Sequence, residues 1–188
     1  MKISIGAVGL MTVFVAGAVR PVLAQDFSVG YQFQRLFATG DSLNLPAGFN
    51  VDVSGSILGH LSVVGQFDWS RKTESNVILG TTLEGTSTLS TFGGGVRWTS
   101  LSNPNATPFI HLVVGATHES DTGKIAGVSF SAANASTTDA MVQVGGGVAL
   151  PLTKSVSAVV QFDYRRILTK DPGTNSMRIV GGIRFKIR

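Results

Sequence analysis

The residues best suited to covalent chemistry lie in one short stretch, His118-Glu119-Ser120. A serine hydroxyl becomes a nucleophile when an imidazole within hydrogen-bond reach takes its proton, and a carboxylate usually orients that imidazole. His118 and Ser120 would share one face of a β-strand, and Asp139 follows as a candidate carboxylate. This set would suit hydrolysis of an acyl ester. However, the spacing is frequent by chance and is also typical of a polar loop, so we predict no enzyme activity.

The remaining candidates for chemistry are scattered along the chain. His60 lies in a predicted tight turn and His111 within a predicted strand, so no two histidines are spaced as metal ligands and we interpret each as structural. The chain has no cysteine, which excludes disulfides and thiolate metal sites. Gly145-Gly146-Gly147 lacks the helix and the Lys-Ser/Thr pair of a phosphate-binding loop. We therefore predict no cofactor and no metal.

The composition of the 188-residue chain excludes several classes of protein. Only 14% of the residues are charged, 43% are hydrophobic and 23 are glycine, whereas about a quarter of the residues of a soluble domain are charged. This argues against a disordered chain and a coiled coil. The formal net charge is +4, and two of the basic residues, Lys2 and Arg20, lie in a segment that we expect to be removed. The remaining positive charge is too small and too scattered for nucleic-acid binding.

The N-terminal residues 1–24 have the form of a secretory signal. Lys2 precedes an apolar run over residues 3–19, and small residues lead up to Ala24. A retained membrane anchor is the alternative, but the apolar run is at the short end for a spanning helix. We predict cleavage after Ala24, which leaves residues 25–188 as one exported domain.

The exported part alternates between apolar and polar residues with a period of two, the pattern of β-strands. Eight such runs are separated by connections that are short, such as 58–60 and 151–154, or long, such as 71–86 and 119–138. An even number of strands with short turns at one end is typical of outer-membrane barrels. We predict an all-β fold, an eight-stranded antiparallel up-and-down transmembrane β-barrel with short periplasmic turns and longer extracellular loops, as a monomer.

The two faces of these strands indicate which solvent surrounds the barrel. A soluble barrel turns its apolar face inward, and a membrane barrel is inverted. The polar face has few charges and many glycines and serines, which fits a crowded interior better than a surface in water, and the apolar face is nearly free of charge, as lipid requires. The charges predicted to form an interior network are Asp52, Asp68, Arg97, Asp163, Arg165, Arg178 and Arg184.

Aromatic residues gather at both ends of the predicted strands. Strands are generally rich in aromatics, but two separate bands favour the interfacial girdles of a membrane barrel. The girdle residues are Phe37, Phe49, Trp69, Phe92 and Tyr164 at the long-loop end, and Phe27, Trp98 and Phe185 at the short-turn end. Phe109 also lies near the short-turn end, but the alternation of side chains along the strand puts it on the polar face unless Pro108 kinks the strand.

The predicted signal is followed by eight alternating runs, and three segments within them are characteristic. They are Gly93-Gly94-Gly95-Val96-Arg97-Trp98, Pro108-Phe109-Ile110-His111 and Arg178-Ile179-Val180-Gly181-Gly182-Ile183-Arg184-Phe185. Together they resemble the small outer-membrane β-barrel domain family, which includes OmpA/OmpX-type barrels and opacity-like surface antigens. The resemblance implies location in the cell outer membrane, contact with its lipids, insertion by the barrel assembly machinery and, in most members, no enzyme activity. The chain departs from the family at its end, because its last aromatic is followed by three more residues.

Three functions remain open for such a barrel. We favour a non-enzymatic structural or surface-contact (adhesin-like) role, with a possible ligand at the extracellular loops 71–86 and 119–138. A small porin-like pore is the second, although eight strands fill their own interior. The third is an enzyme, because outer-membrane lipid A deacylases carry a His-x-Ser pair similar to His118 and Ser120.

Overall fold

The structure is a computed structural model, and it describes most of the exported domain. The described residues are 26–38, 41–78, 81–125, 128–129, 135–168 and 174–187. The predicted signal over residues 1–24 lies outside these ranges and stays a prediction. Among the described residues, no helix has the length and apolar character needed to cross a membrane.

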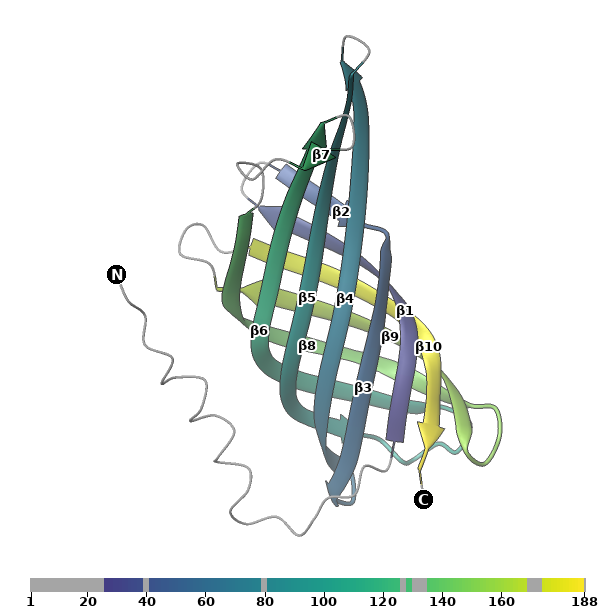
Figure 1. Cartoon of the computed structure of the whole chain (residues 1–188). Helices are drawn as coiled ribbons and strands as arrows, with labels where there is room; N and C mark the ends of the chain where they lie inside the picture. The colour runs from purple at the N-terminus through teal and green to yellow at the C-terminus, as the bar shows by residue number, and fades with distance from the viewer. Residues whose placement is uncertain are drawn as a thin grey trace.

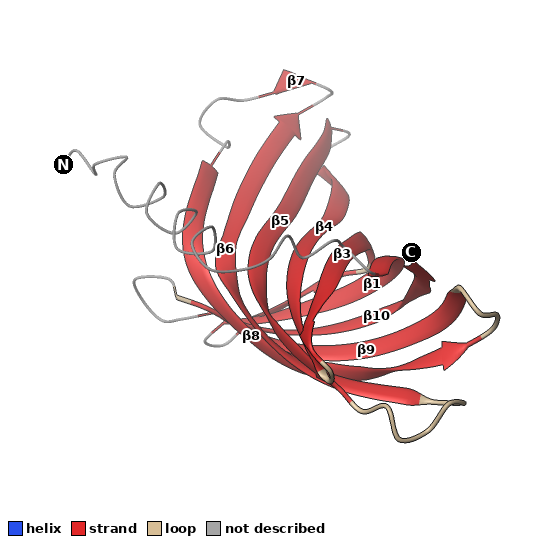
Figure 2. Cartoon of the chain, turned by 90° about the horizontal axis from the view of Figure 1, so that it is seen from below, coloured by secondary structure: helices blue, strands red, loops and turns tan. Residues whose placement is uncertain are grey.

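The described chain consists of antiparallel strands that curve around a common axis (Figures 1 and 2). They are β1 (Asp26–Ala38), β2 (Asp41–Leu45), β3 (Ala47–Leu58), β4 (Leu61–Ile78), β5 (Thr81–Thr99), β6 (Thr107–Ile125), β7 (Val128–Ser129), β8 (Ala135–Pro151), β9 (Val156–Ile167) and β10 (Thr174–Lys186). All except the short β2 and β7 pair in sequence order, and β10 pairs back onto β1. The sheet therefore closes, and the predicted eight-stranded antiparallel barrel is confirmed.

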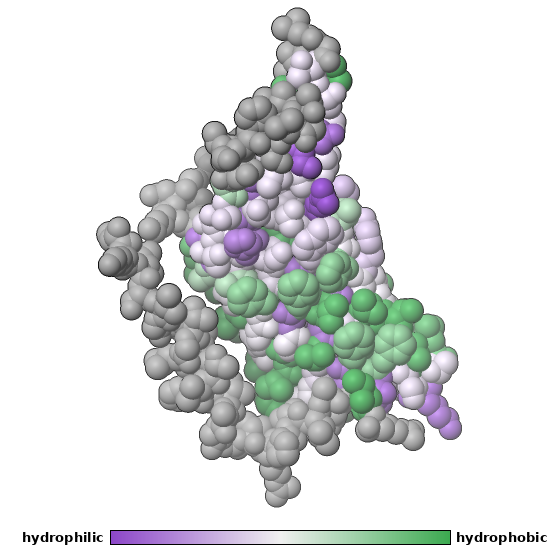
Figure 3. Space-filling model, viewed as in Figure 1, coloured by the Kyte–Doolittle hydropathy of each residue, from purple (hydrophilic) through white to green (hydrophobic). Residues whose placement is uncertain are grey.

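Along most of the barrel wall, side chains alternate between a buried inner face and an exposed outer face. In β9, the polar Asp163 is 0% exposed and its neighbour Phe162 is 50% exposed. This is the reverse of a soluble barrel. Figure 3 shows the outcome on one side of the molecule: apolar residues cover the lower part of the barrel, and polar residues cover the part that projects above it.

Two glycines permit close approaches inside the barrel wall. A Cβ atom at Gly95 would lie 1.9 Å from the carbonyl oxygen of Leu112 on β6. A Cβ atom at Gly145 would lie 1.8 Å from Oδ1 of Asp163 on β9. Glycine at position 145 thus leaves room for a buried carboxylate on the neighbouring strand.

The predicted extents of the long loops are wrong. Residues 71–86 form mostly strand, because β4 and β5 stay paired up to Ile78 and Thr81. Within residues 119–138, β6 continues to Ile125 and β8 begins at Ala135. Outside the membrane both faces of a strand meet water, so the apolar–polar alternation that identifies a strand disappears from the sequence while the backbone pairing continues.

The connection between β1 and β3 also contains a strand, the short β2. Residues 34–38 of β1 pair with β2, and residues 26–31 pair with β3 on the same side. Pro46 joins β2 to β3, and its carbonyl oxygen accepts a hydrogen bond from the Tyr31 hydroxyl. Proline has no N–H to donate to a strand ladder, so this junction is a suitable place for it.

Candidate functional site: a sealed interior and a projecting sheet

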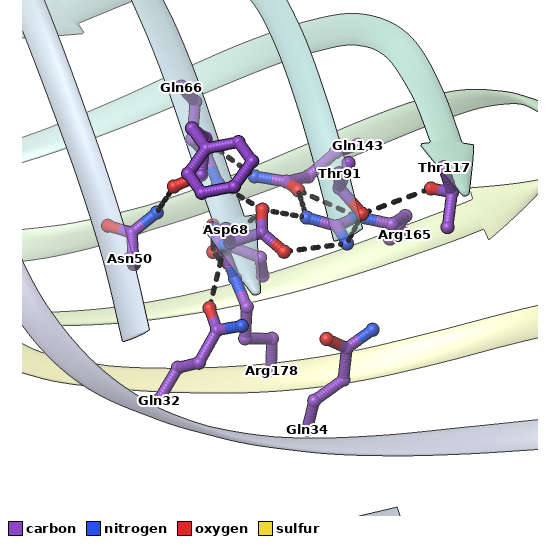
Figure 4. Close-up of polar contacts among 12 residues, drawn as sticks. Gln32, Gln34, Asn50, Gln66, Asp68, Thr91, Thr117, Gln143, Arg165 and Arg178 are labelled. Atoms are coloured by element: carbon purple, nitrogen blue, oxygen red, sulfur yellow. Dashed lines mark hydrogen bonds and ion pairs between the residues drawn. The ribbon is translucent and has the colours of Figure 1, made fainter. Parts of the chain in front are cut away.

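Asp68 on β4 lies at the centre of the ionic network inside the barrel (Figure 4). Its Oδ2 lies 2.7 Å from Nη2 of Arg165 on β9 and 2.9 Å from Nη1 of Arg178 on β10. Arg178 also donates to Asp163, with 2.9 Å between its Nε and the carboxylate oxygen Oδ2. One carboxylate thus links three strands across the interior.

Neutral side chains take up the remaining donors of these arginines. Gln143 accepts hydrogen bonds from Nε of Arg165 at 3.0 Å and from its Nη2 at 2.7 Å, and Thr91 accepts one from its Nη1 at 2.8 Å. Gln32 accepts from Nη1 of Arg178 at 3.2 Å. A buried ion pair is tolerated only when its other hydrogen-bonding groups are also satisfied. The amides and the hydroxyl are therefore part of the same network.

A second group of charges lies nearer the short-turn end. Nη1 of Arg97 lies 3.1 Å from Oδ1 of Asp52, and Nε of Arg184 donates to Ser28 at 3.1 Å. Both guanidinium carbons lie 4.8 Å from the ring centroid of Phe109. Phe109 is therefore an interior residue and not a member of a girdle, because its strand keeps the same alternation of faces after Pro108 and its ring packs against two cations.

The structure places the seven predicted network charges inside the barrel, and each is at most 7% exposed. His111 also lies in the interior, with its Nε2 2.8 Å from Oδ1 of Asp163. Within the described ranges, no group of three or more His, Asp and Glu side chains could hold a metal ion.

Apolar side chains lie on the loop side of the central network. Ile167, Met141 and Leu89 are each two residues closer to the loop end than Arg165, Gln143 and Thr91, respectively, and all three are buried. The same buried cluster includes Leu36 and Leu45, and it extends past the network to Val113, which is paired with Gln143, and to Val64, which is closer to the short-turn end than Asp68. Farther toward the short-turn end, a cavity beside Asn50, Asp52 and Gln161 measures about 10 Å³, roughly the space of one water molecule. The described interior thus offers no continuous water path.

We expect no ion conduction through the folded barrel. Purified protein in a planar bilayer should give no stable single-channel steps, because the ionic network and the apolar cluster fill the lumen. Steps that persist through successive purification stages, and that disappear after heat unfolding, would instead support the porin-like alternative.

The disfavoured alternative, a catalytic triad of His118, Ser120 and Asp139, does not assemble. His118 and Ser120 do share the outer face of β6, but Asp139 is paired with Thr117 and therefore lies on the inner face. Nδ1 of His118 lies 2.8 Å from Oγ1 of Thr138, so a hydroxyl rather than a carboxylate occupies this ring nitrogen. Asp139 instead lies near Glu119, whose pKa is raised by burial and by the charges of Asp121 and Asp139.

The girdle residues all lie on the outer face, most of them exposed and the rest half-buried. At the long-loop end, the ring centroid of Phe49 lies 5.8 Å from that of Trp69. At the short-turn end, the rings of Phe27 and Phe185 are 6.5 Å apart, and Trp98 stacks on His60 at 6.0 Å. His60 is further held by a 2.8 Å contact between its Nδ1 and the Thr99 carbonyl oxygen.

Beyond the loop-end aromatics, β4, β5 and β6 continue together as a sheet that projects from the barrel (Figure 1). β7 pairs with β6 at the far end of this sheet. Its concave side holds an open cavity of about 310 Å³. The cavity is lined by Leu43, Lys72, Glu74, Gly85, Thr86, Ser87, Asp121, Thr122 and Gly123.

No protein-family model and no curated protein sequence matches this chain. Solved structures do match it. The attachment invasion locus protein Ail of Yersinia pestis, in complex with the heparin analogue sucrose octasulfate, aligns with a TM-score of 0.60 and 17% identity over 87% of this chain and 100% of Ail. A second structure of Ail gives a TM-score of 0.59 and 19% identity over the same shares. Neisserial surface protein A aligns with a TM-score of 0.64 and 13% identity over 86% of this chain and 96% of that protein.

This chain has the fold of a small outer-membrane β-barrel. The alignments cover nearly the whole of the Ail and Neisserial surface protein A chains, so the similarity extends over the entire barrel. The apolar, aromatic-bordered outer face agrees with this assignment, because it is the surface that a barrel presents to hydrocarbon. The predicted resemblance to the small outer-membrane barrels is confirmed at the level of the fold.

Proposed function

We propose that this outer-membrane barrel is a non-enzymatic surface-contact protein that binds a partner along the edge of its projecting sheet. The observation that carries the proposal is the strand register. β4 pairs with β3 only as far as Arg71 and Ala47, but it pairs with β5 up to Ile78. In the described part of the chain, residues 72–78 of β4 therefore have no strand partner on the β3 side.

An unpaired strand edge presents a row of backbone N–H and C=O groups that an extended segment of another protein can complete. Side chains on this edge are compatible with such pairing: Thr73, Ser75 and Val77 share one face, and Val77 is 70% exposed. On the other face, Nζ of Lys72 lies 2.5 Å from the Glu74 carboxylate. The charges cancel, so we infer that backbone pairing, rather than charge, would supply the affinity for the partner.

The comparison with Ail supports a contact role, because that protein is an attachment invasion locus protein. Its bound heparin analogue is polysulfated and would require a positively charged surface. The projecting strands of this chain do not offer one, since Lys72 and Lys124 are matched by Glu74, Glu84 and Asp121. We therefore infer a protein segment as the partner of the projecting sheet.

The test is a deletion that preserves the register. Thr73 and Thr86 are directly paired, so residues 73–86 can be replaced by Asn-Gly, a dipeptide suited to a two-residue hairpin turn. Bacteria that display this variant should attach to a host-matrix coating no better than cells without the protein. Gel migration before and after boiling should show that the variant barrel still folds.

Two further variants define what the deletion removes. Val77→Lys keeps the hairpin but places a charge on the edge, which hinders strand addition, and it should also reduce attachment. Glycine and serine substitutions over residues 102–105, at the opposite rim, form the matched control and should leave attachment unchanged. Full attachment by the deletion variant would contradict the proposal.

A further inference from the structure

Two arginines at the short-turn end of the interior keep hydrogen-bond donors that no described residue accepts. Arg97 on β5 binds Asp52 through its Nη1, and Arg184 on β10 donates to Ser28 through its Nε. Nε of Arg97 and Nη2 of Arg184 are buried, and neither has a hydrogen-bond partner among the described residues. Buried N–H groups are nearly always paired in folded proteins. These two nitrogens therefore lack an acceptor that the chain itself does not supply.

The interior charges at this end do not balance either. The central network joins two carboxylates to two guanidinium groups. At the short-turn end, Lys186 lies directly opposite Asp26. Among the described inward residues, this leaves one carboxylate, Asp52, for the guanidinium groups of Arg97 and Arg184, which are 2% and 7% exposed. A buried charge without a partner is strongly destabilising, so a negative charge from outside the chain would stabilise this end of the barrel.

The side chains beside the two arginines provide further donors. Ser62 lies directly opposite Arg97, and Ser157 lies directly opposite Arg184. Directly opposite residues share a face of the sheet, so both hydroxyls lie next to the guanidinium groups on the inner wall, where each can donate a hydrogen bond. Phe109 keeps the two arginines near each other, because both guanidinium carbons lie 4.8 Å from its ring centroid. Guanidinium and hydroxyl donors that lie close together suit an anion.

The space at this end restricts the size of such an anion. The cavity beside Ser28, whose hydroxyl accepts the hydrogen bond from Arg184, measures about 10 Å³, roughly the space of one water molecule. A monatomic ion such as chloride is similar to water in size, whereas phosphate and sulfate are much larger. The ionic network and the apolar cluster fill the lumen on the loop side, so the ion would enter from the short-turn end.

We propose that the short-turn end of the barrel interior binds one small monovalent anion, of the size of chloride, beside Arg97 and Arg184. The anion accepts hydrogen bonds from Nε of Arg97 and Nη2 of Arg184, and it neutralises the positive charge that Asp52 leaves unpaired. This inference does not depend on what the projecting sheet binds.

The first test measures how the stability of the barrel depends on chloride. An ion that binds the folded barrel and not the unfolded chain raises the free energy of unfolding with its concentration. Urea unfolding in vesicles of zwitterionic phospholipid should therefore move to higher urea when sodium chloride replaces sodium gluconate at constant ionic strength, because gluconate is too large for the site. Sodium bromide should act as sodium chloride does.

Three variants separate this site from a general effect of salt. Arg184→Gln removes the surplus charge and leaves the pair of Arg97 and Asp52 in place, so it should unfold at the same urea concentration in chloride and in gluconate. Asp52→Asn removes the only carboxylate beside these arginines that the structure describes, and it should respond to chloride more strongly than the unmodified chain. Lys186→Gln is the matched control, because this cation lies two residues from Arg184 on the same strand but is exposed, and it should keep the full response.

A second measurement needs no variant. Crystals of the unmodified barrel soaked in sodium bromide should show anomalous scattering from a bromide ion within hydrogen-bond distance of the guanidinium groups of Arg97 and Arg184. An equal response to chloride in Arg184→Gln and in the unmodified chain would overturn the proposal, since it would indicate a general effect of salt. The absence of bromide beside the two arginines would also overturn it, since water would then satisfy the donors.

Discussion

Replacing Asp68 by alanine should lower the free energy of unfolding by about 3–5 kcal/mol, the range for removing one partner of a buried ion pair. The substitution would leave Arg165 and Arg178 without their shared carboxylate, in an interior where each is 1% exposed. Urea unfolding of the barrel in lipid vesicles, followed by tryptophan fluorescence, measures the change.

Glu74→Ala provides the matched control for this experiment. Glu74 also pairs with a cation, Lys72, but its side chain is 61% exposed, and exposed pairs contribute about 0–1 kcal/mol. A second variant, Asp68→Asn, keeps the size of the side chain and should still be strongly destabilised. If Asp68→Ala proved no more harmful than Glu74→Ala, the interior network would not stabilise the barrel as described.

Replacing Leu112 by arginine should cost about 2–4 kcal/mol, the range for a cation placed near the bilayer midplane on the lipid face of a barrel. Leu112 is 49% exposed on the outer face of β6. In a soluble protein such an exposed position would tolerate arginine with little change. The same unfolding measurement in vesicles gives the difference.

Val77→Arg is the control, since Val77 is also an outward apolar residue but lies on the part of β4 that projects beyond the barrel. Arginine there would remain in water, and we expect a change within about 0.5 kcal/mol. Similar destabilisation at positions 77 and 112 would show that the outer face of β6 is not surrounded by hydrocarbon.

The barrel was predictable because the membrane enforces an alternation that can be read directly from the chain. Parity alone put Asp163 inside and Phe162 outside. It also put Phe109 inside, and Pro108 does not shift the register of the strand. The alternation ends where the sheet leaves the membrane, so the sequence could not show that β4 extends to Ile78.

The contacts within the interior could not be predicted from the sequence. The alternation along a strand shows which face a residue lies on, but it does not show which residues of neighbouring strands are paired. Nothing in the sequence indicates that Asp68 meets Arg165 rather than Arg97. The alternation would, however, have excluded the candidate triad, because it puts His118 on the outer face and Asp139 on the inner face. In the same way, Arg166, next to the buried Arg165, could have been recognised as an outward cation.

The network of Asp68 has a consequence for the order of assembly. Its bonds join residues 97 and 110 positions apart in the chain, whereas hairpins such as β4–β5 need only local contacts. Contacts between distant residues form slowly because the chain must first close a long loop. We therefore expect Arg165 and Arg178 to remain hydrated until β9 and β10 pair with the rest of the sheet. Closure of the barrel between β10 and β1 would then coincide with dehydration of these two arginines.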